Sequence, residues 1–253
     1  MTTASFDTAD GIRVPAITAE EMRRVDEAAI SGSGPNLYQM MENAGRSLAL
    51  TVIDVLGAGW RSTPIVVLAG TGGNGGGGIC AARHLANRRA DVSVVVTDVA
   101  RLGAVPAQQL AIYRASGGRV AVAADLDTVG PGLVVDALIG YSLTGAPRGA
   151  ALALIEWIES QTAPVVSLDV PSGLDATSGV APGRSVRADI TLTLALPKTG
   201  LGVPGVGDLW VADLGIPAGV YESAGIEVPG GIFGAGYSVR VKAVADGSGH
   251  PGA

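Results

Sequence analysis

The sequence contains few aromatic residues, histidines and cysteines, and each shortage excludes a class of site. Phe, Trp and Tyr together make up 4% of the 253 residues, and there are one cysteine, Cys80, and two histidines, His84 and His250. A single cysteine cannot form an internal disulfide. Two scattered histidines, with no G-x-S-x-G motif, do not suit a zinc site or a Ser-His-Asp triad. No G-K-[ST] follows the glycine-rich segment, which excludes a P-loop.

Basic patches and long apolar runs are missing as well. The net charge is −6 at pH 7 and no basic stripe is visible, so nucleic acid and anionic membranes are not expected partners. No apolar run reaches the roughly 18 residues of a membrane span. The first ten residues lack the basic and apolar regions of a signal peptide. We therefore expect a soluble cytoplasmic protein.

Aliphatic residues dominate what remains and follow an alternating pattern of strands and helices. Hydrophobic residues make up 47% of the chain, and short Val/Ile/Leu runs of this kind are typical of strands buried on both faces. The predicted strands are 65–70, 92–97, 120–123, 133–138, 165–170, 190–196 and 209–214. The predicted helices are 79–89, 106–115 and 150–160. This order predicts an α/β fold with a mostly parallel, doubly wound sheet, whose ligands bind at the carboxyl ends of the strands.

Two more helices are predicted before the first strand. Thr18-Ala-Glu-Glu21 is a capping-box pattern that begins one of them, and the other covers 37–56. The sequence leaves open whether they form a lid or a dimer contact. Residues 1–15 are expected to be a loose lead. We expect one α/β domain over 1–217 and a glycine-rich C-terminal extension over 218–253, partly ordered and disordered from Gly247 onward.

The segment from Gly70 to Gly78 is the most distinctive in the chain. Seven of its nine residues are glycine, and Gly70 to Gly75 matches G-x-G-x-x-G between a predicted strand and a predicted helix. Asn74 is a polar side chain within this run, and Asp98 ends the next strand, where a ribose-binding acid would lie. Two interpretations of this segment are open: a loop that binds a ligand, and a turn that needs glycine only for tight packing.

Charged residues follow three further strands of the predicted sheet. Asp136 ends strand 133–138, Asp169 ends strand 165–170, and Lys198 follows strand 190–196. Strand ends of a parallel sheet meet at one edge, so these groups predict an active site beside the glycine-rich segment. The alternatives are that the carboxylates cap loop amides and that the lysine is a solvated surface residue. Asp175 is interpreted as a turn cap, and Cys80 as a packing residue or a thiol of lowered pKa.

Five segments together resemble the NAD(P)H-hydrate epimerase family, which is also the N-terminal domain of bifunctional nicotinamide-nucleotide repair proteins. The resemblance covers roughly residues 16 to 217, and Asp-x-Pro-Ser-Gly-Leu-Asp is its most specific motif. The segments are 37–46, 70–85, 135–138, 164–175 and 195–201.

The resemblance implies a Rossmann-like three-layer α/β/α fold, a homodimer, and interconversion of the R and S epimers of hydrated NADH or NADPH, with a bound potassium ion. It places the potassium ligands at Asn74, Asp136 and Ser172, and the catalytic groups are expected to be Asp169 and Lys198. The implied substrate-binding residues are Asp169 and the two loops Gly73, Asn74, Gly75, Gly76 and Gly77, and Gly140, Tyr141, Ser142, Leu143, Thr144, Gly145 and Ala146.

Four positions depart from the family pattern, and one of them is Gly73, which stands where the family has Asn. Gly77 stands where the family has Asp, and Tyr141 and Ser142 add bulk to a loop that usually begins Gly-Thr-Gly. These changes favour an alternative, a non-catalytic nucleotide-binding relative that has lost turnover. A second alternative, an NAD(P)-dependent oxidoreductase, rests only on the glycine motif and Asp98, without a catalytic Tyr-Lys or His pair.

Overall fold

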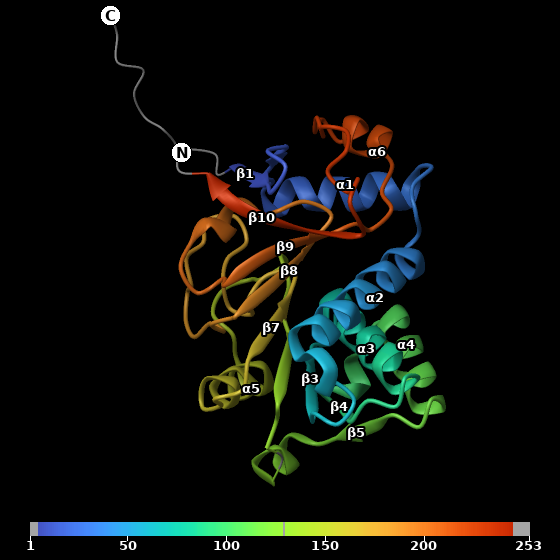
Figure 1. Cartoon of the computed structure of the whole chain (residues 1–253), viewed down its shortest axis with the longest axis vertical. Coiled ribbons are helices and arrows are strands. Elements are labelled where there is room, and N and C mark those ends of the chain that lie inside the picture. Colours follow the sequence, from blue (N-terminus) through green and yellow to red (C-terminus); the bar gives the residue numbers. More distant parts are fainter. Residues whose placement is uncertain (1–4, 129, 245–253) are drawn as a thin grey trace, which may run out of the picture.

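The chain folds around one ten-stranded sheet, seen nearly edge-on in Figure 1. The structure is a computed structural model, and it describes residues 5–128 and 130–244. The strand order is β2-β1-β10-β9-β8-β7-β6-β3-β4-β5. From β9 to β5 all neighbouring strands are parallel, whereas β10, β1 and β2 add to the β9 edge as antiparallel strands.

The strands are β1 (Ser5–Thr8), β2 (Arg13–Pro15), β3 (Ile65–Ala69), β4 (Val92–Val96), β5 (Arg119–Ala121), β6 (Leu133–Ala137), β7 (Val165–Leu168), β8 (Ile190–Leu194), β9 (Asp208–Ala212) and β10 (Ser238–Val244). The helices are α1 (Ala19–Ser31), α2 (Leu37–Leu56), α3 (Gly73–Ala86), α4 (Ala104–Ala115), α5 (Gly149–Glu159) and α6 (Ala218–Ser223). Every strand and helix predicted between 92 and 214 occurs, with ends within two residues of those expected.

The strand order reverses around β3, which places the site. β3 lies between β4 and β6 and is buried along its whole length. The chain therefore leaves β3 toward one side of the sheet and later returns to its other side. In open parallel sheets this switch point opens a crevice at the carboxyl ends of the strands.

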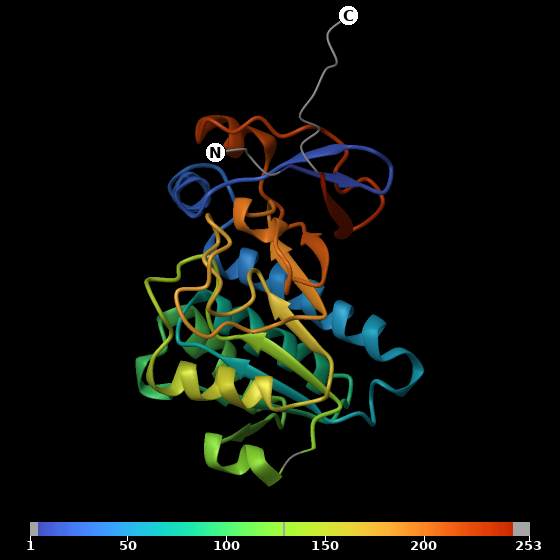
Figure 2. The ribbon, with the colours of Figure 1, turned by 90° about the vertical axis from the view of Figure 1, so that its left-hand side faces the viewer.

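Helices cover both faces of the parallel part. The helices α2, α3 and α4 lie on one face, and α5 covers the other (Figures 1 and 2). One apolar cluster joins Leu48, Leu85 and Leu110 of the first face to the sheet, and a second joins Leu154 and Ile155 of α5 to it. The fold is therefore the three-layer α/β/α arrangement that the sequence predicts.

Both N-terminal helices begin at capping side chains, the first of which was predicted. Thr18 and Glu21 form a reciprocal capping box at α1. The Asn36 side chain accepts hydrogen bonds from the backbone N–H groups of Tyr38 and Gln39 at the start of α2. Capping satisfies N–H groups that the first turn of a helix leaves unpaired. The predicted range 37–56 is confirmed.

The glycine-rich segment is mostly helix, where a loop was predicted. The helix α3 begins at Gly73, six residues before the predicted start. Glycine has a low helix propensity, but packing decides here: a Cβ on Gly75 would lie 1.9 Å from the carbonyl oxygen of Gly70. Tight packing therefore explains part of the glycine content that suggested a ligand loop.

Two predictions about the chain ends are wrong. Residues 5–8 and 13–15 are strands, where a loose lead was expected, and β1 pairs with β10 in antiparallel register. The strand β10 also pairs with β9, so residues 218–244 belong to the domain and no boundary falls at 217. The disorder predicted from Gly247 onward lies outside the described residues. No helix in the described ranges is both long and apolar enough to cross a membrane.

The position of β10 inside the sheet generates a stability prediction. Val241 is 2% exposed, whereas Ala243 on the same strand is exposed. Replacing Val241 with Asp buries an unpaired carboxylate and should lower the free energy of unfolding by at least about 2 kcal/mol, measured by urea denaturation. The matched control Ala243→Asp should change it by less than about 0.5 kcal/mol. Equal effects of the two variants would contradict the placement of β10.

Candidate active site

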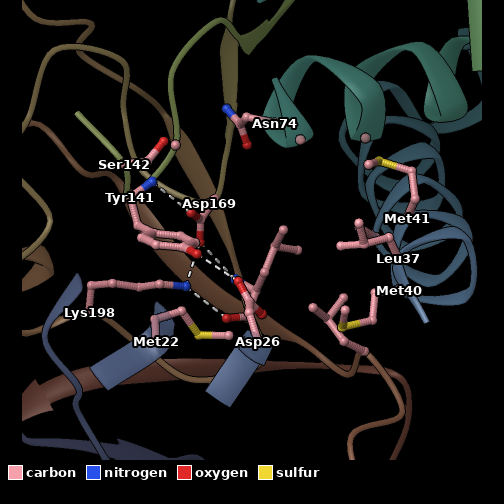
Figure 3. Close-up of a pocket in the computed structure, with 16 residues that line it drawn as sticks. Met22, Asp26, Leu37, Met40, Met41, Asn74, Tyr141, Ser142, Asp169 and Lys198 are labelled. Carbon is pink, nitrogen blue, oxygen red and sulfur yellow. Dashed lines mark hydrogen bonds and ion pairs between the residues drawn. The ribbon is translucent and has the colours of Figure 1, made fainter. Parts of the chain in front are cut away.

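A cavity of about 290 Å³ opens at the switch point between two chemically different walls. Figure 3 shows the polar side chains on one side and α2 on the other. The apolar wall comes from α1, α2 and the end of β9 and consists of Met22, Leu37, Met40, Met41, Ala44 and Leu214. The polar wall comes mainly from strand ends and consists of Asp26, Asn74, Tyr141, Ser142, Asp169 and Lys198.

Asp169 and Lys198 form a buried ion pair at the centre of the polar wall. Lys198 Nζ lies 2.5 Å from Asp169 Oδ1, and the side chains are 1% and 4% exposed. The other carboxylate oxygen, Oδ2, accepts the backbone N–H of Tyr141 at 3.0 Å. A desolvated carboxylate is stable only with such partners. The prediction that both residues meet at one edge of the sheet is confirmed.

The Asp169 backbone turns sharply as it leaves β7. Its φ is +67°, in the left-handed region that Asp tolerates better than most residues. The Asp169 N–H donates to the Leu192 carbonyl oxygen at 2.7 Å, which holds this turn against β8. Gly140 passes close by, since a Cβ there would lie 2.9 Å from Asp169 Oδ2. This turn aims the carboxylate into the cavity.

Lys198 is completely buried, so the surface-lysine interpretation is wrong. Its ammonium group also donates to the Leu194 carbonyl oxygen at 2.8 Å and approaches Thr193 Oγ1 at 3.3 Å. Three partners account for its three N–H donors. Its backbone is fixed by Ile17, which bridges Pro197 and Thr199 just before α1.

Asp136 is fully buried in β6 and collects four hydrogen bonds. Ser172 donates its hydroxyl to Oδ1 at 2.5 Å and its N–H to Oδ2 at 2.8 Å, and Ser167 Oγ donates to Oδ2 at 2.8 Å. The Leu138 N–H is the fourth donor. Burial raises the pKa of Asp136, and these four hydrogen bonds oppose that rise. The predicted pair Asp136 and Ser172 is therefore in direct contact.

Asn74 reaches the same region from the first turn of α3. Neither its amide oxygen nor its amide nitrogen has a hydrogen-bond partner among the described residues, although both atoms are buried. A Cβ on Gly140 would lie 3.3 Å from Asn74 Oδ1, so the amide faces the loop after β6. Buried polar atoms without a partner are rare in proteins. The amide oxygen is therefore available to a ligand.

The cavity gathers some of the predicted substrate-binding residues and not others. Those that line it are Gly73, Asn74, Gly77, Gly140, Tyr141, Ser142 and Asp169. Gly75 and Gly76 are buried inside the packing of α3 and do not line it. The rest of the second loop, Leu143 to Ala146, lines a separate hollow of about 260 Å³ that shares Ser142 with the cavity.

The departure at Gly77 has a packing consequence. A Cβ on Gly77 would lie 2.7 Å from Leu168 Cδ2, so an Asp side chain at this position would displace Leu168. Tyr141, the second departure, lies across the polar wall, and its hydroxyl donates to Asp26 Oδ2 at 2.6 Å. The Tyr141 side chain therefore connects the loop after β6 to α1.

The sequence analysis missed Asp26 and the apolar wall. Asp26 lies one turn after Met22 on α1, and the two side chains face the cavity from the same side of the helix. In the sequence, the i, i+4 spacing of Asp26 from the apolar Met22 was the signal that could have placed Asp26 on this face of the helix. Met40 and Met41 are buried, as expected of packing residues, but they also line the cavity. Both N-terminal helices thus cover the site.

Two other predicted residues lie away from the cavity. Asp98 is exposed and accepts the Ala100 N–H, so it caps a short turn, and nothing in its surroundings favours a ribose-binding role. Asp175 accepts the N–H groups of Thr177 and Ser178, as predicted for a turn cap. Burial raises the pKa of Asp175, but the hydrogen bonds from Ser178 and Thr177 together outweigh it and hold the pKa below its ordinary value.

Comparison with known families decides the relationship of the chain. A family model described as YjeF-related protein N-terminus matches residues 37–200. The chain belongs to this family. The matched range includes every residue of the polar wall except Asp26, which precedes it.

Relatives at high identity are similar to the chain over most of its length. A protein of Dehalogenimonas lykanthroporepellens named NAD(P)H-hydrate epimerase is 49% identical over 238 residues, which cover 94% of this chain and 97% of the relative. A protein of Truepera radiovictrix with the same name is 37% identical, covering 83% and 94% of the two chains. A bifunctional NAD(P)H-hydrate repair enzyme of Salinibacter ruber is 37% identical, but the match spans only 45% of its length.

A solved structure shares the fold. The crystal structure of yeast ynu0 superposes with a TM-score of 0.77 at 22% sequence identity, and the match covers 90% of this chain and all of the yeast chain. The chain and the yeast protein therefore share their fold.

A second polar cluster of this family member lies between α2 and α3. Glu42 is ion-paired with Arg83, and its other oxygen lies 2.9 Å from His84 Nε2. Cys80 Sγ lies 3.3 Å from Arg83 Nη2 and 3.6 Å from Glu42 Oε2. Burial and the neighbouring Glu42 raise the pKa of Cys80 to about 12. The lowered pKa that was one interpretation for Cys80 is therefore wrong.

The Cys80 environment generates a reactivity prediction. The thiol is 0% exposed and protonated at neutral pH, and thiolate is the reactive form. Iodoacetamide at pH 8 should leave the native protein unmodified for hours and should alkylate Cys80 rapidly in 6 M guanidinium, as measured by intact mass. A Cys80→Ser variant controls for other sites. Modification of the native protein at the rate of the unfolded protein would contradict the buried, protonated thiol.

Proposed function

We propose that the protein interconverts the R and S epimers of hydrated NADH and NADPH. The observation that carries the proposal is the buried Asp169–Lys198 pair, which directs a carboxylate into a cavity with one apolar wall. The names of the full-length relatives support the same activity. The proposal includes those residues predicted from the sequence to bind substrate or act in catalysis that line the cavity.

The two walls suit a nicotinamide ring. Met22, Met40 and Met41 offer polarizable contacts to the apolar edge of the ring. The C6 edge would then meet Tyr141, with Asp169 toward one face of C6. A volume of about 290 Å³ accommodates the ring with its carboxamide and leaves the rest of the nucleotide outside.

The reaction needs no redox step. Hydration puts a hydroxyl group on C6 of the dihydronicotinamide ring, and inversion requires either the C6–O bond or the ring C6–N1 bond to break and re-form. We propose the first route, in which the C6–O bond re-forms on the other face. Loss of the hydroxyl leaves positive charge on the ring nitrogen and C6. A fixed carboxylate in a site of low dielectric stabilises such a cation more than water does.

Asp169 supplies that carboxylate and accepts the proton of the incoming water. Lys198 holds the Asp169 carboxylate in place, and its three N–H groups are engaged by Asp169, Thr193 and Leu194. Lys198 is therefore a positioning residue.

The nucleotide part is proposed to follow the loop after β6. Ser142 belongs to both the cavity and the adjoining hollow, which Leu143, Thr144, Gly145 and Ala146 line with Arg148 at one end. Backbone N–H groups and a guanidinium group are suitable partners for ribose and phosphate oxygens.

Potassium is proposed to bind at Asn74, Asp136 and Ser172. The orphaned amide oxygen of Asn74 and the buried carboxylate of Asp136 form, with the Ser172 hydroxyl, the oxygen donor set that a hard monovalent cation prefers. When bound, the ion would add a fixed positive charge beside the phosphate-bearing part of the nucleotide. The family resemblance also supports a homodimer, for which the exposed side chains of Ile30, Leu37 and Tyr38 offer apolar area.

The central prediction concerns Asp169. Asp169→Asn removes the charge that stabilises the cation and should lower the rate of R/S exchange by about 10²- to 10⁴-fold, measured by HPLC or NMR on purified epimers. The turn cap Asp175 lies away from the cavity, and Asp175→Asn should exchange the epimers at the wild-type rate.

Asp169→Asn also leaves the Lys198 charge buried without its counter-ion, which destabilises proteins by about 3–5 kcal/mol. The double variant Asp169→Asn/Lys198→Met removes both charges, and it should recover thermal stability but no activity. Unchanged turnover in the single variant, or recovered turnover in the double variant, would contradict the role of Asp169. Absence of exchange in the wild-type protein would favour the non-catalytic binding relative instead.

The cation proposal is tested by thermal denaturation. Potassium chloride should raise the melting temperature above that in choline chloride of equal ionic strength, by an amount equivalent to about 2.7 kcal/mol at 100 times the dissociation constant. Asn74→Ala removes an amide oxygen and should abolish the difference between the two salts. A potassium effect of equal size in wild type and variant would refute this ligand.

A further inference from the structure

Asp26 is a second carboxyl group in the cavity, and its environment differs from that of Asp169. Asp169 is ion-paired with Lys198, whereas Asp26 forms no ion pair with any described residue. Its hydrogen-bond partner is the Tyr141 hydroxyl, 2.6 Å from Oδ2. Both carboxyl groups line the same cavity and lie on either side of Tyr141 (Figure 3).

We propose, resting on the epimerisation above, that Asp26 is the general acid that protonates the C6 hydroxyl group so that it leaves as water. Asp169 is then the base for the water that adds to the opposite face. Two carboxyl groups in different electrostatic environments, here one with a lysine as ion-pair partner and one with no ion pair among the described residues, are the usual arrangement of an acid and a base in one site. Nothing in the sequence pattern or in the names of the relatives assigns this role to Asp26.

The pKa of Asp26 is raised above its ordinary value, and the main cause is burial rather than the surrounding charges. Burial against α2 and the strand ends raises the pKa of Asp26, and the nearby Asp169 adds to the rise, whereas the Tyr141 hydrogen bond and the Lys198 charge lower it. Tyr221 on α6 is a further titratable group facing Asp26, and Arg23 on α1 acts on Tyr141. Burial is the largest of these effects on Asp26.

The other polar groups of the cavity cannot take the same role. The three N–H donors of Lys198 are already engaged. Burial and the adjacent Asp26 raise the pKa of Tyr141, and its hydroxyl proton is directed at Asp26. Asp26 is thus the available proton donor on this wall.

The step balances in protons and electrons. The Asp26 carboxyl proton moves to the C6 oxygen, the C6–O bond breaks with its electron pair on the departing water, and the ring nitrogen lone pair forms a C6–N1 double bond. A water molecule attacks the other face of C6, the electrons of that double bond return to nitrogen, and the proton of the water moves to Asp169. Solvent then returns one proton to Asp26 and removes one from Asp169. The opposite epimer reacts by the same steps in reverse.

The decisive variant is Asp26→Asn. It keeps an acceptor for the Tyr141 hydroxyl but has no acidic proton, so R/S exchange should fall by about 10²- to 10⁴-fold. The matched control is Glu27→Gln, because Glu27 is the exposed neighbour on α1, and it should retain the wild-type rate. Circular dichroism and the melting temperature establish that both variants are folded. Wild-type exchange in Asp26→Asn overturns the proposal.

The pH profile separates a proton donor from a residue that only supports the fold. If Asp26 must be protonated, kcat falls as pH rises through the pKa of Asp26. Tyr141→Phe removes the hydrogen bond that lowers this pKa, so the descending limb should move to higher pH by about one unit. This measurement does not need Asp26→Asn to fold. An unmoved limb in a folded, active Tyr141→Phe variant counts against the proposal.

Oxygen exchange distinguishes failure of this proposal from failure of the proposed function. In H₂¹⁸O each epimerisation that breaks the C6–O bond puts solvent oxygen on C6. Exchange with ¹⁸O uptake in the wild type, both lost together in Asp26→Asn, supports the general acid. Epimerisation without ¹⁸O uptake overturns the acid role and leaves the epimerase activity standing. No epimerisation in the wild type removes the activity itself.

Discussion

The site depends on one buried ion pair, and so does much of the surrounding backbone. Lys198 and Asp169 are both almost inaccessible to solvent, and desolvating two charges is favourable only when their geometry and hydrogen bonds are nearly complete. A complete set of partners for this ion pair requires three things. The strands β7 and β8 must end at the same level, the loop after β6 must place the Tyr141 N–H against Asp169, and Ile17 must hold the backbone around Lys198. A change in any of these segments would leave a buried charge short of a partner.

The sequence predicted the parts of the fold that local patterns determine. The α2 range follows from its apolar periodicity, and the charged residues after β6, β7 and β8 meet because parallel strands end at one edge. The strands β1 and β2 were missed because each is four residues or fewer, and because β1, with which β2 pairs, finds its other partner in β10, more than 220 residues along the chain. Short segments that pair over such distances carry little local signal.

Asp26 shows why part of the site could not be predicted. It stands among Glu20, Glu21, Arg23, Arg24 and Glu27, a run that is typical of a solvated helix face. The i, i+4 spacing of Asp26 from Met22 is a weak signal, and the packing of α1 over the strand ends is what distinguishes Asp26 from these neighbours. The composition of the glycine-rich segment suggested a ligand-binding loop, but Gly75 packs against the Gly70 carbonyl oxygen and Gly77 against Leu168, so that most of the segment is a tightly packed helix.

The pairing of β1 with β10 has a consequence for the synthesis of the protein. Ser5 lies opposite Val244 in this register, so the earliest described residues find their partner only after almost the whole chain has left the ribosome. Contacts of such large sequence separation form slowly and late. The helix α1 follows β2 directly and packs against α6, and Asp26 therefore reaches the cavity only when the chain is nearly finished. A partly synthesised chain therefore lacks the side of the cavity that α1 supplies.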